Sequence, residues 1–234
     1  TRQTRFLPVQ LAQSIMEINK NKAYRSLVHK LLKLKDHLRG MPFPKMARIK
    51  QISGYHCGPA VLVSLFSFLG VKTSQKRVVA SLRAQNKIKQ YGLNMKDLAR
   101  AAAFTGKGAF VFWKKSGGKM TDLHLIINKY KYPVGVEWQG VFYEDEDEDN
   151  GHYSIVTAID KGKSVLRMAD AYPKFAGVDR GFKIHDFMER WWDSNEITVS
   201  GTTKKRTVYD SKMMFIIIPK GESWPKKLGM AKTS

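Results

Sequence analysis

The sequence predicts an α+β fold in which N-terminal helices pack on an antiparallel sheet. A helical N-terminal extension is expected to precede this fold in the sequence. The order of the segments carries this prediction. Stretches with helical periodicity fill the chain up to about residue 129, and stretches rich in strand formers follow from residue 133. With 234 residues, the chain is long enough to bury a substantial core.

The first part of the chain is expected to be a basic helical extension. Apolar residues recur at helical spacing within residues 11–38, and two prolines and a glycine in residues 40–44 end that pattern. We therefore expect an extension at residues 1–40, a main domain at 41–220 and a basic tail at 221–234.

The main domain is expected to begin with a buried helix, because Pro59 precedes a continuous apolar run from Val61 to Phe66. Ser74 and Asn94 are typical helix N-caps. Shorter helices are predicted at residues 74–85, 94–104, 121–129 and 185–192. Strands are predicted at residues 133–142, 152–159, 164–169 and 213–219.

The charge of the chain is strongly unbalanced, with 41 lysines and arginines against 20 acidic residues and a net charge of +21. Such a balance predicts a polyanion partner, either nucleic acid, an anionic surface or an acidic protein. Lys30, Lys33 and Lys35 flank an apolar stripe in the extension and are candidates for this contact. No nucleic-acid motif is present, so binding would be electrostatic. A solvated basic surface without a partner is the alternative.

One acidic run, Glu144–Asp149, interrupts this basic background directly before Gly151-His152. A block of like charges is usually a solvated loop tip. Two functional interpretations stay open. The run could select basic substrate residues or repel acidic ones, or it could bind a divalent cation through its oxygen atoms.

Cys57 is the single cysteine of the chain and stands where the first buried helix begins. The free N–H groups and the dipole of a helix N-terminus favour negative charge, and therefore a thiolate. A cysteine nucleophile needs this environment, although a lone buried cysteine is more often a small hydrophobic residue. A single cysteine also excludes an intrachain disulfide, which is typical of reducing compartments and favours a cytoplasmic location.

A thiol nucleophile needs a base and a group that orients the base. Of the six histidines, His152 is the best candidate, because it opens a predicted strand that is followed by a turn and a second strand ending at Asp170. Antiparallel pairing around this turn would place His152 and Asp170 at the same end of a hairpin. The carboxylate could then accept the ring N–H. Of the other histidines, His29, His37 and His185 lie in predicted exposed segments, His124 lies in a short amphipathic helix, and His56 stands directly beside Cys57.

These residues resemble the papain-like cysteine peptidases of the bacteriocin-processing type, which remove double-glycine leader peptides. The resemblance rests on Gln51, on Cys57-Gly58-Pro59-Ala60 opening a helix, on Gly151-His152 and on Asp170 closing the next strand. It covers residues 43–219. Two features depart from the family pattern: Ala171 follows the aspartate where the family often has proline, and residues 196–209 are longer than a minimal member needs.

The resemblance implies a Cys57–His152–Asp170 triad, with Gln51 donating a hydrogen bond to the oxyanion together with the Cys57 backbone N–H. The implied activity is that of a cysteine peptidase or amide hydrolase that needs no cofactor and cleaves a peptide or protein, after small residues such as Gly-Gly. The alternative is a catalytically idle peptidase-fold subunit that binds nucleic acid or another polyanion. No transmembrane segment is expected, because the longest apolar run, residues 60–71, is shorter than the about 20 residues that span a bilayer.

Overall fold

The computed structural model describes residues 42–85, 88, 92–142, 151–198 and 205–233. The chain divides into two units, residues 1–44 and residues 45–234. The second unit contains all the helices and strands given below. The extension expected at residues 1–40, with its three candidate lysines, and the acidic run at 144–149 lie outside the described residues.

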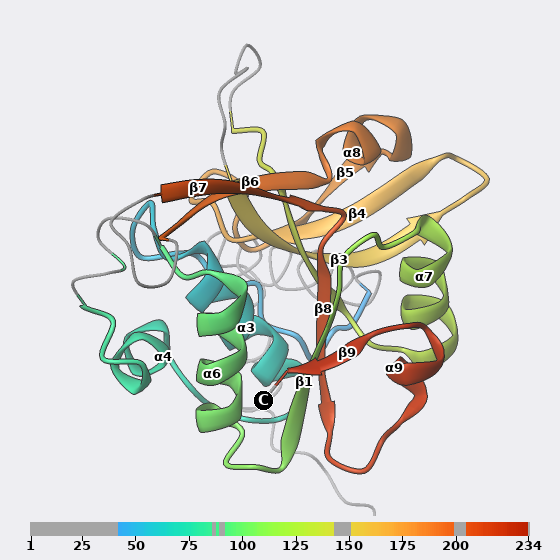
Figure 1. The fold of residues 1–234 in the computed structure, drawn as a ribbon. Helices are drawn as coiled ribbons and strands as arrows, with labels where there is room; N and C mark the ends of the chain where they lie inside the picture. The colour runs from blue at the N-terminus through green and yellow to red at the C-terminus, as the bar shows by residue number, and fades with distance from the viewer. Residues whose placement is uncertain (1–41, 86–87, 89–91, 143–150, 199–204, 234) are drawn as a thin grey trace, which may run out of the picture. The chain divides into compact units, whose positions relative to one another are not determined.

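Three helices lie together on one side of the main sheet: α3 (Cys57–Phe68), α4 (Gln75–Ser81) and α6 (Met95–Thr105) (Figure 1). Helix α3 is apolar around its whole circumference and buries every residue from Gly58 to Phe66. Ser74 and Asn94 cap α4 and α6, because their side chains accept hydrogen bonds from the backbone N–H groups three residues later.

A seven-stranded sheet has the order β5-β4-β3-β2-β8-β1-β9, and all its neighbouring strands are antiparallel. The strands are β1 (Phe110–Lys115), β2 (Val134–Gln139), β3 (Gly151–Asp160), β4 (Val165–Asp170), β5 (Asp179–Lys183), β8 (Met214–Pro219) and β9 (Ala231–Thr233). The central strands β2 and β8 are buried along nearly their whole length. The α+β class and the helices packed on an antiparallel sheet are therefore confirmed.

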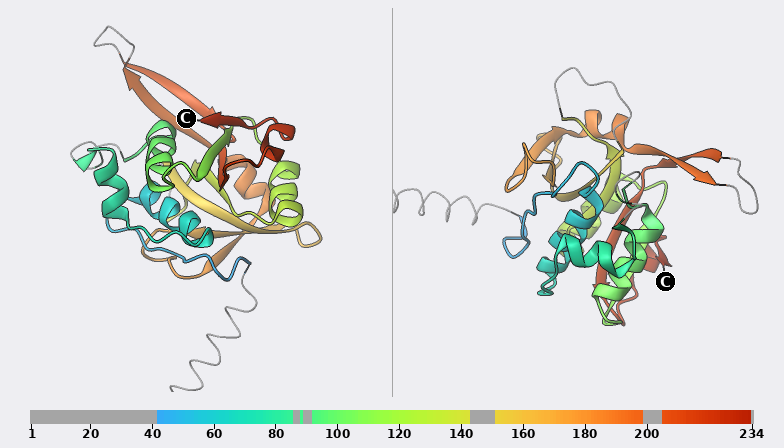
Figure 2. Two further views of the ribbon diagram at one scale, coloured as in Figure 1. Left: turned by 90° about the horizontal axis from the view of Figure 1, so that it is seen from below. Right: turned by 90° about the vertical axis from the view of Figure 1, so that its left-hand side faces the viewer.

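Helix α7 (Met120–Leu125) continues into a π-helical turn, η1 (Ile126–Tyr130), and lies across β3 from α3 (Figures 1 and 2). Helix α8 (Ile184–Arg190) ends earlier than the sequence predicts, because β6 (Trp192–Thr198) starts directly after Trp191. Strand β6 pairs with β7 (Lys205–Ser211), and this two-stranded hairpin extends beyond the main sheet (Figure 2). It accounts for the additional length at residues 196–209.

The segment expected to be a basic tail, residues 221–234, contains helix α9 (Trp224–Lys227) and strand β9. Strand β9 pairs with β1 at the edge of the sheet. The side chains of Pro225 and Met230 are buried, and the Trp224 ring stacks on Tyr130. Apolar burial therefore attaches this segment to the sheet despite its lysines.

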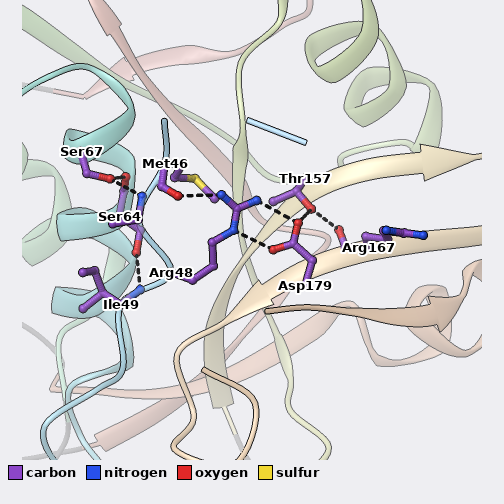
Figure 3. Close-up of polar contacts among 9 residues, drawn as sticks. Met46, Arg48, Ile49, Ser64, Ser67, Thr157, Arg167 and Asp179 are labelled. Carbon is purple, nitrogen blue, oxygen red and sulfur yellow. Dashed lines mark hydrogen bonds and ion pairs between the residues drawn. The ribbon is translucent and has the colours of Figure 1, made fainter. Parts of the chain in front are cut away.

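A buried ion pair joins the segment before Cys57 to the sheet (Figure 3). The guanidinium of Arg48 donates two hydrogen bonds, both of 2.9 Å, to the two carboxylate oxygens of Asp179 on β5. A third N–H of Arg48 reaches the Met46 carbonyl, and the hydroxyl of Thr157 on β3 lies 2.8 Å from Asp179. Both charged side chains are at most 5% exposed, so their partners within the protein must replace the hydration that they lose.

The same segment is also attached to α3. The hydroxyl of Ser67 accepts a hydrogen bond from the Ala47 N–H at 2.7 Å, and that of Ser64 accepts one from the Ile49 N–H at 3.3 Å (Figure 3). Residues 46–49 therefore lie between the helix that begins at Cys57 and the strands of the sheet. This placement restricts where Gln51, two residues after Ile49, can lie.

We predict that Arg48→Met lowers the free energy of unfolding by about 3–5 kcal/mol, because it leaves the buried Asp179 without its cation. Urea denaturation monitored by tryptophan fluorescence measures this loss. The matched control is Arg100→Met, since the Arg100 side chain is 56% exposed and 3.9 Å from Asp97; it should cost less than about 1 kcal/mol. Equal losses in the two variants would contradict a dominant role for the buried pair.

Candidate active site

Cys57 is the first residue of α3 and is partly exposed. Pro59 lies in the first turn of the helix. Proline is tolerated there because a backbone N–H at this position would have no partner within the helix. Gly58 allows a close approach, since a Cβ atom there would lie 2.9 Å from Leu98 and 3.4 Å from Tyr153 on β3. The helix can therefore bring the thiol against the beginning of β3.

His152 is the second residue of β3, and its side chain is 3% exposed. Its Nε2 atom lies 2.8 Å from Oδ1 of Asp170, the last residue of β4. The strand register explains the contact, because Asp170 is paired with Ser154 and is thus a diagonal neighbour of His152. The Cys57 side chain lies near enough to the His152 ring to contribute to the raised pKa of that histidine. Since Nε2 faces Asp170, Nδ1 is the nitrogen left for the thiol.

Asp170 is surrounded by further donors that the sequence did not reveal. Its Oδ1 accepts the backbone N–H of Tyr172 at 2.9 Å, and its Oδ2 faces the Arg180 guanidinium at 3.2 Å. A second Arg180 nitrogen donates to the Val141 carbonyl, and the guanidinium lies over the rings of Phe175 and Phe182. Arg180 is thereby held in place beside the carboxylate.

These contacts set the protonation of the pair. Burial lowers the pKa of His152, but the charge and hydrogen bond of Asp170, with a smaller contribution from Cys57, outweigh it and raise the pKa to about 10. For Asp170, burial raises the pKa, whereas His152, the Tyr172 N–H and Arg180 lower it, and the net direction is down. The pair therefore favours an imidazolium next to a carboxylate.

An aromatic cover lies over the His152 ring. The Phe142 ring meets it edge to face, with centroids 4.9 Å apart, and stacks on Tyr172 at 4.3 Å. Gly140 makes room for this cover, since a Cβ atom there would lie 2.6 Å from Phe142 and 3.0 Å from His152. These rings restrict the access of water to the histidine.

Gln51 is buried, and its backbone N–H donates to the carbonyl of Ala171, the residue after Asp170, at 2.8 Å. The side-chain Nε2 of Gln51 donates one hydrogen bond to the Ser53 carbonyl at 3.0 Å. The amide NH₂ group has two N–H donors, so one donor remains. The Gln75 side chain bonds the Lys50 carbonyl and the Ile52 N–H on either side of Gln51. Gln75, which the sequence did not single out, thus fixes the backbone that carries Gln51.

The remaining described histidines do not face the thiol in this way. The Nδ1 atom of His56 lies 2.6 Å from the Ser53 hydroxyl, and burial lowers the pKa of this histidine. His185 is exposed and lies 3.4 Å from Glu189 on the same helix. His124 lies in α7, on the far side of β3 from α3. His29 and His37 fall outside the described residues.

A cavity of about 220 Å³ opens beside Cys57. It is lined by Gly54, Tyr55, Cys57, Gly92, Leu93, Asn94, Glu137, Gly151, Tyr153 and Asp193. Within the described residues, no cluster of histidine, cysteine and acidic side chains could hold a metal ion. In the same part of the chain, no helix is both long and apolar enough to cross a membrane.

No family model and no curated protein matches the chain. Among solved structures, it is similar to the peptidase domain of Streptococcus ComA, a bi-functional ABC transporter involved in a quorum sensing pathway. The sequence identity is 16% and the TM-score 0.48, over 74% of this chain and 97% of that one.

Two further solved structures are similar at comparable levels. One is a double glycine motif protease from an AMS/PCAT transporter in complex with the leader peptide, with 13% identity, a TM-score of 0.49, and coverage of 78% of this chain and 96% of that one. The other is the N-terminal peptidase C39-like domain of a toxin secretion ATP-binding protein from Vibrio parahaemolyticus. Its sequence identity is 14% and its TM-score 0.43, with coverage of 68% of this chain and 96% of that one. The chain is therefore structurally similar to double-glycine peptidase domains at low sequence identity.

We predict that the His152 ring stays protonated well above its ordinary range and titrates near pH 10. Because the folded-state pKa is above the ordinary 6.5, the stability that this proton contributes is present below 6.5 and is lost as the pH rises toward 10. Asp170→Asn removes the main favourable charge and should lower the pKa. The ring ¹⁵N shifts, followed by NMR from about pH 5 to 11, measure both values.

The control for this titration is Asp186→Asn, an exposed acid in the first turn of α8, which should leave the His152 ring unchanged. A wild-type titration near 6.5 would show that Asp170 does not govern this proton.

Proposed function

We propose that this protein is a cysteine peptidase or amide hydrolase in which Cys57 is the nucleophile and His152 the base. The observation that carries the proposal is the His152 ring, which bonds Asp170 through Nε2 and lies near enough to the Cys57 side chain for that residue to help raise its pKa. A nucleophile, a base and an orienting carboxylate arranged in this order form the general pattern of thiol and hydroxyl hydrolases.

The proposed reaction begins with the Cys57 proton already on His152, whose raised pKa favours the imidazolium, and the thiolate sulfur attacks the scissile carbonyl carbon. The carbonyl electron pair becomes an oxyanion. As this intermediate collapses, the C–N bond breaks, the amine leaves with the proton from His152 and a thioester remains. Water then adds to the thioester with His152 as base, which releases the acid and restores the thiol.

Two donors are proposed for the oxyanion. The backbone N–H of Cys57 lies in the first turn of α3, where N–H groups have no partner within the helix. The Gln51 amide keeps a second N–H beyond the one that it gives to Ser53. Donors fixed before the reaction stabilise the charge that develops in the transition state.

The substrate is proposed to be a peptide or protein. The chain's similarity to a double-glycine protease solved with its leader peptide motivates testing peptides that contain Gly-Gly, as the sequence resemblance also did. The cavity beside Cys57 is large enough for a side chain of a bound peptide.

Cys57→Ala is expected to abolish peptide hydrolysis while leaving cooperative unfolding intact. His152→Ala should cost nearly as much, because the two residues act as a unit, and Asp170→Asn should cost less. Release of a fluorophore from Gly-Gly peptides measures the rates, with His185→Ala as a matched surface control. Unchanged hydrolysis in Cys57→Ala would refute the proposed mechanism. Salt-sensitive polyanion binding, without alkylation of Cys57 that depends on His152, would favour an idle binding subunit instead.

Gln51→Ala should lower kcat by about a hundredfold, the usual loss for one oxyanion donor. Alkylation of Cys57 by iodoacetamide builds no oxyanion and should change little in this variant. Gln85→Ala, at an exposed glutamine, is the matched control and should leave both rates unchanged. Equal losses of hydrolysis and alkylation in Gln51→Ala would assign Gln51 a purely structural role.

A further inference from the structure

The cavity beside Cys57 contains two buried acidic side chains, Glu137 and Asp193, for which the proposed hydrolysis has no use. Glu137 comes from β2 and is paired with Tyr153 on β3. Asp193 comes from β6, which lies against β2. Both carboxyl groups therefore line the same space as the nucleophile, on a wall made by the sheet and the β6–β7 hairpin.

Glu137 is 1% exposed, and only one of its oxygens is satisfied. Oε1 accepts a hydrogen bond from the Tyr153 hydroxyl, whereas Oε2 accepts none from the described residues, and the further contact of this carboxyl group is with the Asp193 carboxyl. A buried carboxyl oxygen without a donor is costly and rare in folded proteins. A ligand that donates hydrogen bonds from inside the cavity would remove this cost.

Asp193 is fixed beside Glu137. Its Oδ1 accepts a hydrogen bond from the buried Gln139 side chain at 3.0 Å. Gly151 lets the carboxylate approach the start of β3, since a Cβ atom at this position would lie 2.5 Å from Oδ1. The position of Asp193 is therefore set by a specific donor and a specific glycine, which distinguishes it from a surface acid.

We infer that this cavity binds a positively charged nitrogen group of the peptide, either a lysine or arginine side chain or a free α-amino group, close to the bond that Cys57 attacks. This assignment rests on the proposed function and names the substrate class. An ammonium or guanidinium group supplies several N–H donors to a pair of carboxylates. A metal ion fits less well, because the described residues here form no cluster of metal ligands.

The volume of the cavity is large enough for the nitrogen group of a lysine, an arginine or a chain terminus. A volume of about 220 Å³ is several times the roughly 30 Å³ that one water molecule occupies in the liquid. The cavity is lined near Cys57 by Tyr55, which is 49% exposed, and by the exposed Gly54 and Asn94. An extended peptide passing Cys57 could thus place one side chain in the cavity.

The protonation of Glu137 gives a second way to recognise the binding of a cation in this cavity. Burial raises the pKa of Glu137. The Tyr153 hydrogen bond lowers it, and the charges of Asp193 and Asp210, together with a hydrogen bond to Asp193, raise it, to about 8 overall. Tyr153 has a pKa well above 10 and stays neutral, and Tyr55, Cys57 and Asp193 are the other titratable groups of the cavity lining. A bound cation would replace the proton on Glu137, so its affinity should increase as the pH rises toward 8.

The test measures peptide binding to the Cys57→Ala protein, which cannot turn the peptide over. N-acetylated hexapeptides of glycine and alanine carry one lysine at each position in turn, and each is matched by an arginine and a norleucine peptide. A set with free α-amino groups completes the series. Calorimetry should show that lysine or arginine at one position, or the free amine, binds about tenfold more tightly than its neutral match.

The variants that test the cavity are Glu137→Gln and Asp193→Asn in the Cys57→Ala background. Each should abolish the preference for the cation, and Glu137→Gln should also abolish the rise in affinity with pH. Glu189→Gln is the matched control, because Glu189 is exposed on α8 and outside the cavity lining. If one of these two variants fails to fold, the other still tests the cavity.

The outcomes separate this inference from the proposed function. Equal binding of charged and neutral peptides, or a preference that survives both cavity variants, would overturn the inference even if the wild type hydrolyses peptides. A preference that both variants abolish, combined with no hydrolysis and no His152-dependent alkylation of Cys57, would support the cation site and overturn the proposed hydrolase.

Discussion

The buried Arg48–Asp179 ion pair holds the two parts of the candidate site together. Arg48 belongs to the segment that precedes Gln51 and Cys57, whereas Asp179 lies on β5, beside the strand that ends at Asp170. The bond from the Gln51 N–H to the Ala171 carbonyl continues the same connection. Buried ion pairs contribute little net stability, but a misplaced partner is strongly penalised. We therefore regard this pair as the constraint that sets how the thiol segment meets the sheet.

A second constraint concerns the charges of His152 and Asp170. An imidazolium buried to this degree needs a fixed negative partner, and Asp170 needs donors that keep it ionised. Three elements supply them: β3 carries His152, β5 carries Arg180 and the chain after β4 carries the Tyr172 N–H. Because Arg180 is itself held between two aromatic rings, the carboxylate is oriented from both sides. The proton of His152 is thus controlled by tertiary packing rather than by neighbouring residues in the sequence.

The sequence predicts the parts of this site that depend on local patterns. The helix that starts at Cys57 follows from Pro59 and the apolar run behind it, and the nearness of His152 to Asp170 follows from the single turn between their strands. Contacts between distant segments leave no such pattern. Arg48 and Asp179 are 131 positions apart, and strand β1 and the β6–β7 hairpin carry too mixed a sequence to show a regular alternation. Glu137 interrupts the buried strand β2, and an acid within an apolar run was the one available signal for the cavity.

Tyr153 connects the two groups of charges around Cys57. It follows His152 in β3, its ring faces Gly58 in α3, and its hydroxyl donates to Glu137. A negative charge at Glu137 would oppose a thiolate at Cys57, because like charges in a buried site repel strongly. A proton on Glu137 removes this repulsion in the empty cavity, and a bound cation would remove it in the complex. The acidic cavity and the thiol chemistry are therefore compatible, provided that the cavity never holds a bare carboxylate pair during attack. On this argument, the cationic group of the proposed substrate would both position the peptide and maintain the charge balance that Cys57 requires as the proposed nucleophile.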